Sequence, residues 1–254
     1  MKNTEPKILF FDIENAPNLA YVWAKYEQNV IDYEKEWYML CFAYKWLGQK
    51  TVKSFALPDF KKYKQDKTND EHLIRELWKL FDEADVIIGH NSDRFDIRKS
   101  NARFIKYGLT PPSPYKTVDT KKVGYKHFMF NSNKLDDLGE YFGLGRKIKT
   151  DFDLWLGCMS GDKTSWNKMI KYNKRDVSLL ERVYNKMLPW INNHPNVGMF
   201  YGTEVCPKCG STNMQSRGLY KNKTTEYNRL YCKSCGGWSR KIKNLRKEKP
   251  LVSV

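Results

Sequence analysis

An apolar run that ends in two carboxylates, at residues 8–14, is the feature that most constrains how this chain can fold. The run reads Ile-Leu-Phe-Phe-Asp-Ile-Glu, and its hydrophobic side chains predict a buried central strand. Because side chains alternate across a strand, Asp12 and Glu14 point to the same face. Two anions beside a core repel each other and lose hydration, which favours a compensating cation such as a metal ion. Two solvated acids at the end of a strand are an equally good interpretation of this pair alone.

Length and composition indicate a folded protein. With 254 residues, the chain can form one large domain with a small one, or two domains of ordinary size. Hydrophobic residues make up 41% and aromatic residues 15% of the chain, which together with charges of both signs argues against disorder. No apolar run approaches the length of a membrane span, and no apolar signal segment precedes the first strand. We therefore expect a cytoplasmic protein that has no membrane partner.

The charge balance favours a polyanionic partner. The formal net charge is +16, and nucleic acid is the commonest partner of a protein in which basic and aromatic residues are interleaved. Residues 201–254 hold 12 Lys and Arg against 3 Asp and Glu, a net charge of +9, whereas residues 1–200 hold 33 against 26, a net charge of +7. The C-terminal region is therefore much the more basic part.

Hydrophobic periodicity predicts a mixed α/β architecture. Residues 38–46 and 51–57 alternate as strands and form an antiparallel meander with the first strand. Short strands at residues 86–89 and 117–120 then alternate with helices. The helices are expected at residues 70–81, with Asp70 as the N-cap, and at 96–107, 135–142 and 165–187. This order predicts a mixed five-stranded sheet flanked by helices.

The segment between the first two strands, residues 19–37, is rich in aromatic residues. It contains, among charged residues, Tyr21, Trp23, Tyr26, Tyr33 and Trp37. We expect a helix that packs over the edge of the sheet, because aromatic side chains more often fill cores than form platforms. A surface on which nucleic-acid bases stack is the alternative.

Two further acids lie in patterns of their own. Asp96 ends the pattern Asn91-x-x-x-Phe95-Asp96 at a strand-to-helix junction, a position that carries sites in α/β folds. Asp176 follows Tyr172 by four residues on a predicted helix, so both side chains share one helix face. Taken singly, Asp96 could be a helix cap, Tyr172 a core aromatic and Asn91 a turn residue.

In combination, the motifs FDIE, IGHN-x-x-x-FD and Y-x-x-x-D resemble those of the DEDD superfamily of 3′-5′ exonucleases, also called DnaQ-like. The tyrosine resembles that of the DEDDy branch, and the three motifs, over residues 7–188, look most like the proofreading domain of family-B DNA polymerases. This resemblance implies an RNase H-like fold in which strands one to three are antiparallel and the others run parallel to the first. Because there is no room for a polymerase palm and fingers, the chain looks like a free-standing relative.

The resemblance also implies a role for each site residue. Asp12 would bridge two catalytic Mg²⁺ or Mn²⁺ ions, and Glu14 and Asp176 would complete the first ion. Asp96 would hold the second ion, and Tyr172 would orient the nucleophilic water. Substrate contacts are expected from two other residues of the second motif, Asn91 and Phe95.

The expected activity is a metal-dependent 3′-5′ exonuclease that hydrolyses the terminal phosphodiester bonds of single-stranded DNA, in phage or bacterial replication or repair. Two alternatives remain open. One is a nucleic-acid-binding protein whose nuclease fold is inactive, although all four acids and the tyrosine are present. The other is a structure-selective endonuclease of the same RNase H-like fold.

Two C-x-x-C pairs near the C-terminus predict a structural metal site. Cys206 and Cys209 are separated from Cys232 and Cys235 by 22 residues, and a glycine follows each pair. Four thiolates at this spacing can enclose Zn²⁺ tetrahedrally, as in a zinc ribbon. Disulfide bonds are the alternative, and the expected cytoplasmic location disfavours them.

The cysteine pairs lie in the basic and aromatic C-terminal region. We predict an RNase H-like exonuclease domain at residues 1–190, a linker at 191–202 and a zinc ribbon with a basic tail at 203–254. Basic and aromatic side chains together suit phosphate contact and base stacking. The residues expected to contact nucleic acid in this way are Arg217, Lys221, Trp238 and Arg240. Docking of another protein is the competing interpretation of this region.

Overall fold

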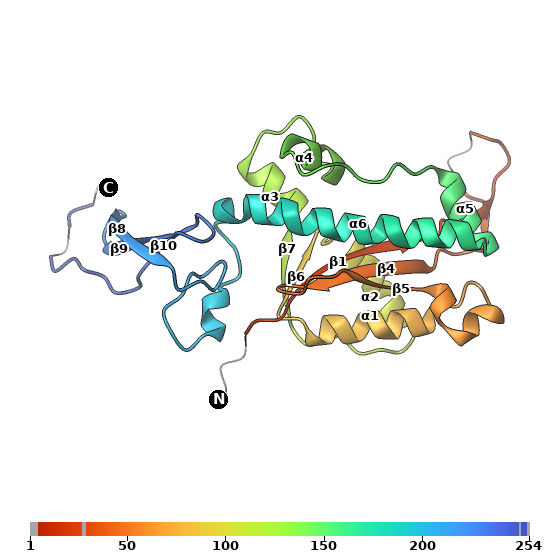
Figure 1. Ribbon diagram of the computed structural model, residues 1–254, viewed down its shortest axis with the longest axis horizontal. Coiled ribbons are helices and arrows are strands. Elements are labelled where there is room, and N and C mark those ends of the chain that lie inside the picture. Colours follow the sequence, from red (N-terminus) through yellow and green to blue (C-terminus); the bar gives the residue numbers. More distant parts are fainter. Residues whose placement is uncertain (1–4, 27–28, 249, 253–254) are drawn as a thin grey trace.

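The computed structural model has a sheet with helices on both faces and a small separate sheet at one end (Figure 1). It describes residues 5–26, 29–248 and 250–252. Among these residues, no helix combines the length and the apolar character that crossing a membrane requires.

The central sheet has five strands in the order β5-β4-β1-β6-β7. Their bounds are β1 (Ile8–Asn15), β4 (Met39–Trp46), β5 (Lys53–Ala56), β6 (Val86–Gly89) and β7 (Lys116–Asp119). β4 is antiparallel to β1 and β5, whereas β6 is parallel to β1 and β7. This topology confirms the mixed five-stranded sheet predicted from the sequence. Because β1 lies in the middle with helices on both faces, its side chains are apolar on both sides until the acids begin.

Within the described residues, six α-helices flank the sheet. Their bounds are α1 (Glu71–Glu83), α2 (Asp96–Lys106), α3 (Thr120–His127), α4 (Leu135–Tyr141), α5 (Phe152–Ser160) and α6 (Lys163–Met187). Short 3-10 helices are η1 (Leu57–Asp59), η2 (Lys61–Lys64), η3 (Leu188–Trp190) and η4 (Val197–Phe200). The hydrophobic pattern predicted α1, α2, α4 and α6 and missed α3 and α5.

Alternation along β1 divides the core into two layers. Phe11 packs edge-on against Phe81 of α1, with ring centroids 5.0 Å apart. Phe10 points to the opposite face and packs against Tyr184 of α6 at 5.3 Å. Since Asp12 follows Phe10 by two residues, it shares the face that α6 covers. The long helix α6 crosses that face in Figure 1, with α1 and α2 on the other side of the sheet.

Asp70, the expected N-cap of α1, directs its carboxylate elsewhere. It stands at the N-cap position but makes no side-chain capping hydrogen bond. The backbone amide of Met39 donates to its Oδ2 at 2.8 Å, and the guanidinium of Arg103 in α2 forms an ion pair with its Oδ1. The capping prediction is therefore wrong in its chemistry, because this buried carboxylate instead joins α1 to β4 and α2.

The aromatic segment after β1 forms a hairpin, so the prediction of a helix is wrong. β2 (Leu19–Tyr21) pairs antiparallel with β3 (Asp32–Lys35) as a separate two-stranded sheet. Every described residue from Asn18 to Glu36 is exposed. The β-branched Val30 and Ile31 before β3 fit extended backbone better than a helix.

The C-terminal sheet is antiparallel and consists of β8 (Met214–Lys221), β9 (Glu226–Cys232) and β10 (Trp238–Arg240), with β9 in the middle. The chain between α6 and this sheet packs on the main body, because Ile191 and Val197 are buried in the core layer that contains Tyr184. The domain bounds at residues 190 and 203 stay predictions.

Candidate active site

Three carboxylates converge at the end of β1. Asp12 and Glu14 lie on the face of β1 that α6 covers, and Asp176 projects from the middle of α6. One carboxylate oxygen from each lies within 4.8 Å of the others. Asp176 is almost fully buried, with 1% of its surface exposed. The structure thus brings together three of the four acids that the sequence analysis selected.

The fourth acid and the tyrosine border this group. Asp96, the first residue of α2, is buried, and its charge raises the pKa values of Asp12 and Glu14, so it faces the same centre. It lies outside the compact group of three acids. Tyr172 lies one turn before Asp176 on α6 and is also buried. We call Asp12, Glu14, Asp96, Tyr172 and Asp176 the acidic centre.

Burial and mutual repulsion raise the pKa values of the acids. Burial, followed by the charge of Asp176, raises the pKa of Glu14 to about 8. Burial is likewise the main cause that raises the pKa of Asp96 to about 7, and it raises that of Asp12 well above the ordinary value. The centre therefore favours the binding of protons or of other cations.

The donor set fits a hard divalent ion. It consists of carboxylate oxygens, which Mg²⁺ and Mn²⁺ prefer. Oδ1 of Asp176 is buried and has no hydrogen-bond partner among the described residues. A buried anionic oxygen without a partner is costly, and coordination to a cation would satisfy it. The residues present therefore fit the predicted metal ions.

Lys147 supplies a positive charge that the sequence analysis missed. Its ammonium forms an ion pair with Oδ2 of Asp176, and it donates a hydrogen bond to the hydroxyl of Tyr172 at 3.2 Å. It lowers the pKa values of Asp12 and Glu14 against the effects of burial and repulsion. Lys147 comes from the chain between α4 and α5, where no motif marks it.

Asn173 is a second residue that the motifs did not predict. It is fully buried on α6, and its Nδ2 donates to Oδ2 of Asp12 at 2.7 Å. Its Oδ1 lies 3.8 Å from the sulfur of Cys41 on β4. Asn173 therefore fixes the orientation of one carboxylate oxygen of Asp12. Helical spacing could have found it, because it lies three residues before Asp176 on the same face.

The loop that presents Asp96 is held by Asp119 at the end of β7. Asn91 in this loop has a φ of 66°, a left-handed conformation that asparagine tolerates better than most residues. Its backbone amide donates to Asp119 at 2.8 Å, and its carbonyl accepts from the amide of Phe95 at 3.0 Å. The structure thus places Asn91 in a tight turn. Its contact with substrate stays a prediction.

A cavity of about 610 Å³ opens beside the acidic centre. It starts at Asn15, directly after Glu14, and Phe95 is one of its walls. Trp155 of α5 lines it as well and packs edge-on against Tyr172, with ring centroids 6.2 Å apart. Its walls therefore connect the predicted substrate residue Phe95 with the acids.

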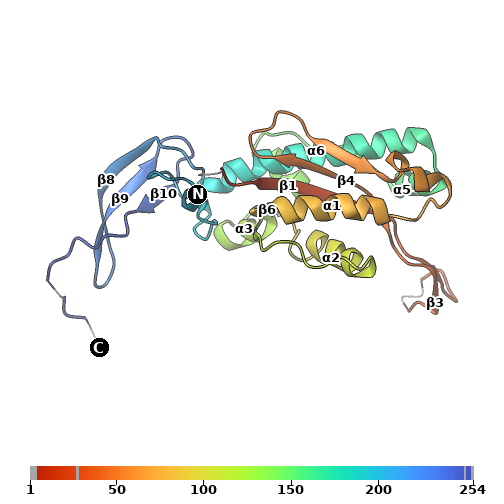
Figure 2. The same cartoon turned by 90° about the horizontal axis from the view of Figure 1, so that it is seen from below.

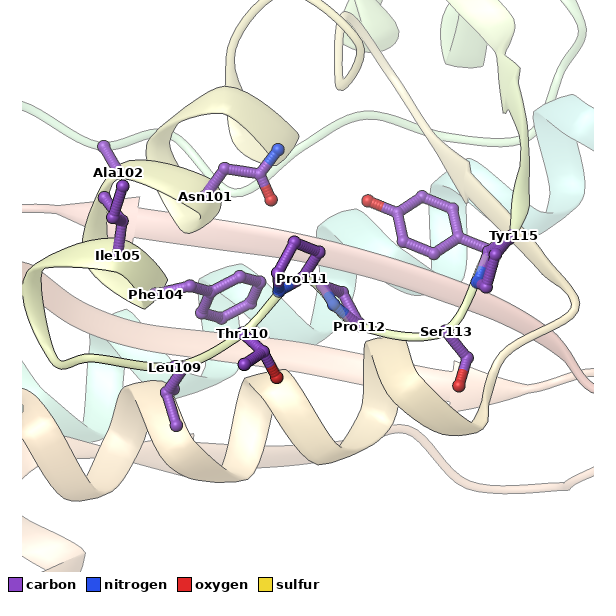
Figure 3. Close-up of a pocket in the computed structure, with 11 residues that line it drawn as sticks. Asn101, Ala102, Phe104, Ile105, Leu109, Thr110, Pro111, Pro112, Ser113 and Tyr115 are labelled. Carbon is purple, nitrogen blue, oxygen red and sulfur yellow. The ribbon is translucent and has the colours of Figure 1, made fainter.

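A second hollow, of about 640 Å³, lies between α2 and the chain that leads into β7 (Figure 3). Phe104, Pro111 and Tyr115 border it in this view. None of its lining residues carries a carboxylate, thiol, imidazole or amine. This hollow offers no group for hydrolysis, so the acidic centre is the candidate active site.

The four C-terminal cysteines form a second cluster. Their sulfur atoms lie within 4.8 Å of one another, and both the Cys206–Cys235 and the Cys209–Cys232 pairs are 3.7 Å apart. A tetrahedral ion with Zn–S bonds of about 2.3 Å separates its sulfurs by about 3.8 Å. All four thiols are free, so the alternative of disulfide bonds is wrong.

The two cysteine pairs have the same backbone geometry. The amide of Gly210 donates to the carbonyl of Cys206 at 2.9 Å, and the amide of Gly236 donates to that of Cys232 at the same distance. Both glycines have positive φ angles, 73° and 77°. A side chain would be strained there, which explains the glycine after each pair.

The four C-terminal residues predicted to contact nucleic acid lie on the three-stranded sheet, far from the acids. Arg217 lies over the ring of Tyr231 at 4.6 Å, and Arg240 lies over Tyr227 at 3.9 Å. Trp238 is half exposed. The fourth residue, Lys221, forms an exposed ion pair with Glu226. These contacts place cations and aromatic rings side by side, and the role of the four residues in binding stays a prediction.

Comparison with protein families decides the class of the chain. A family model described as the RNase H superfamily matches residues 9–188, which is more than half of the sequence. The chain belongs to the RNase H superfamily. The match runs from β1 through the end of α6 and so contains every residue of the acidic centre.

This member of the RNase H superfamily is also similar to a solved structure. The family B DNA polymerase from the hyperthermophilic archaeon Pyrobaculum calidifontis matches with a TM-score of 0.56 and 15% sequence identity. The match covers 89% of this chain and 33% of the polymerase chain, so this chain spans about a third of the polymerase. At this identity the likeness concerns the fold. A search of curated proteins gives no match.

Proposed function

We propose that this protein is a metal-dependent nuclease that removes nucleotides from the 3′ end of single-stranded DNA. Membership of the RNase H superfamily supports a nuclease. The observation that carries the proposal is the convergence of Asp12, Glu14 and Asp176 within 4.8 Å, with Asp96 and Tyr172 beside them. The DEDDy motifs on which this set was selected support the 3′-5′ direction.

The carboxylates would hold two Mg²⁺ or Mn²⁺ ions. When bound, such a pair activates the attacking water and stabilises the leaving oxygen of a phosphodiester. Asp12 would be one of the residues that hold them, because the amide of Asn173 occupies only its Oδ2. Asp176 offers its unpartnered Oδ1 to the same volume.

Tyr172 acts as a hydrogen-bond donor that orients the water. Burial, and then the charges of Asp176 and Glu14, raise its pKa above the ordinary value of about 10. The phenol therefore keeps its proton at neutral pH, and it is a poor general base. Lys147 donates to the phenol oxygen, which therefore does not use its own proton in this contact.

The cysteine cluster would hold one structural Zn²⁺, and the C-terminal sheet would bind the nucleic acid. The 3.7 Å sulfur distances support the zinc site. The net charge of +9 in residues 201–254 supports contact with phosphates. Loss of this region should weaken binding and flatten its salt dependence.

Labelled oligonucleotides test the activity. With Mg²⁺, we expect a 5′-labelled single strand of DNA to shorten one nucleotide at a time, and a 3′-labelled strand to release its label at once. Asp12→Asn should abolish the reaction, Tyr172→Phe should slow it, and a chelator should stop it. A parallel RNA strand measures the preference between the two nucleic acids. Absence of any metal-dependent product would overturn the proposal and leave a nucleic-acid-binding protein with an inactive centre.

An endonuclease is the second candidate, because RNase H-like centres also cut within chains. Figure 1 shows the hairpin after β1 at one end of the molecule and the C-terminal sheet at the other, with the central sheet between them. A closed single-stranded circle separates the two candidates, since cutting of the circle would exclude the exonuclease.

A further inference from the structure

The hairpin formed by β2 and β3 belongs neither to the acidic centre nor to the C-terminal sheet. We call residues 18–36 the arm. Trp23 and Tyr26 near its tip are 86% and 84% exposed, and Tyr21 and Tyr33 on its strands are about half exposed. Figure 2 shows the arm standing away from the body, near the label β3.

This exposure of aromatic surface is unfavourable in water. Soluble proteins rarely leave a contiguous apolar surface uncovered unless it binds something. The aromatic residues of the arm do not stand alone, because Val22, Val30 and Ile31 next to them are exposed as well. Among the described residues, nothing folds over them. The arm is therefore a candidate binding surface.

The root of the arm is fixed to the wall of the active-site cavity. The amide of Trp37 donates to Oδ1 of Asn18 at 2.7 Å, which closes the base of the hairpin. Asn18 and Trp37 both line the cavity that begins beside Glu14. The ammonium of Lys99 lies 3.6 Å from the centre of the Trp37 ring and lines the same cavity. The arm thus continues the cavity outward from the acidic centre.

The charge of the arm does not favour phosphate as its ligand. Residues 18–36 hold two basic residues, Lys25 and Lys35, against four acidic ones, a net charge of −2. This contrasts with the basic C-terminal region. An acidic surface repels the phosphates of single-stranded and duplex nucleic acid alike, so charge attracts neither to the arm. Aromatic rings, however, stack on the faces of unpaired bases whatever their sequence.

We propose that the arm binds single-stranded nucleic acid by stacking Trp23 and Tyr26 on unpaired bases next to the nucleotide in the acidic centre. The proposal rests on the nuclease function proposed above, because that function places a strand in the adjoining cavity. A duplex hides its base faces and gains nothing from the arm. The arm therefore selects single-stranded over double-stranded substrate.

Binding measurements on the full-length chain test this proposal without turnover. Trp23→Ala/Tyr26→Ala is compared with Tyr125→Ala, which removes an exposed tyrosine from α3. Fluorescence anisotropy in chelator gives Kd for a 20-nucleotide single strand and for the same sequence as a duplex. We expect the double variant to bind the single strand at least about tenfold more weakly. Duplex affinity and the salt dependence of binding should not change, and Trp23→Phe should retain most of the affinity.

A strand with abasic sites next to its 3′ end makes the test specific for stacking. Wild type should bind the abasic strand as weakly as the double variant binds the normal strand. The double variant should bind the abasic strand with little further loss of affinity. Unchanged single-strand affinity in the variant, or an equal loss for duplex, would overturn the proposal and leave the arm as a protein-docking surface. If the variant loses affinity for the single strand alone and the wild type hydrolyses nothing, the proposal for the arm stands and the proposed nuclease function is refuted.

Discussion

The acidic centre brings three carboxylates together and the cysteine cluster brings four thiols together, by different means. The acids come from β1, α2 and α6, between residues 12 and 176, and the two core layers hold those elements in place. The cysteines all come from residues 206–235, and only Cys232 lies in the C-terminal sheet, which buries few side chains. A metal would therefore do chemistry at the first site and maintain the fold at the second.

The largest effect is expected from Cys206→Ser. Replacing one of four zinc ligands should lower the zinc content from about one per chain to near zero and unfold the C-terminal sheet. The main body should keep its cooperative unfolding. Zinc analysis and circular dichroism measure this, with Cys158→Ala, a buried cysteine outside the cluster, as control. A zinc-free variant whose C-terminal sheet stays folded would show that metal does not maintain the fold at the cysteine cluster.

Asp12→Asn should act on chemistry and leave the fold intact. Loss of a bridging ligand removes several kcal/mol of transition-state stabilisation, which lowers the rate by about a thousandfold. The melting temperature should not fall, because the substitution removes repulsion between buried acids. Asp137→Asn in α4 is the control. A variant that loses activity only because it unfolds would make the acidic centre structural, like the cysteine cluster.

Lys147→Met should affect stability differently in the metal-free and the metal-bound acidic centre. Without metal, the variant leaves the buried Asp176 carboxylate without its cation, which should lower the free energy of unfolding by about 3 kcal/mol. Saturating Mg²⁺ should recover much of this loss, because the ions supply the missing charge. Denaturant unfolding in chelator and in Mg²⁺ measures both values, with Lys147→Arg as control. Equal losses in the two conditions would argue that metal does not bind near Asp176.

A smaller effect should appear in the pH dependence of metal-free stability. Glu14 has an ordinary pKa of about 4.5 when unfolded and about 8 when folded. Between these values the folded chain holds a proton that the unfolded chain has released, so the contribution of Glu14 to stability falls as the pH rises. Melting temperatures from pH 5 to 8 should show this fall, and Glu14→Gln should weaken it. Mg²⁺ should stabilise the wild type most at pH 8.

The sequence predicted what depends on local spacing. The sheet follows from apolar runs that alternate or stay buried, and the cysteine cluster follows from two C-x-x-C pairs with a glycine after each. Asp12 and Glu14 share a face by strand alternation, and Tyr172 and Asp176 share one by helical spacing. These relations follow from the periodicity of a strand or a helix and do not depend on contacts with the rest of the chain.

The sequence analysis missed the features that depend on contacts between distant segments. Lys147 comes from a loop with no pattern of its own, and only folding brings it to Asp176. The arm was predicted as a helix because its aromatic residues were assumed to be buried. In fact they are exposed, which favours the alternative that they form a binding surface. Asp70 was predicted to be a cap from its position just before α1, and the sequence could not show that its carboxylate pairs with Arg103 of α2 instead.

Anomalous diffraction from crystals soaked with Mn²⁺ tests the central claim most directly. We predict two manganese peaks about 3.5–4 Å apart among Asp12, Glu14, Asp96 and Asp176, and their loss in Asp12→Asn. A zinc-edge map should show one separate peak among the four cysteines. Crystals with zinc at the cysteines and no manganese at the acids would contradict the account.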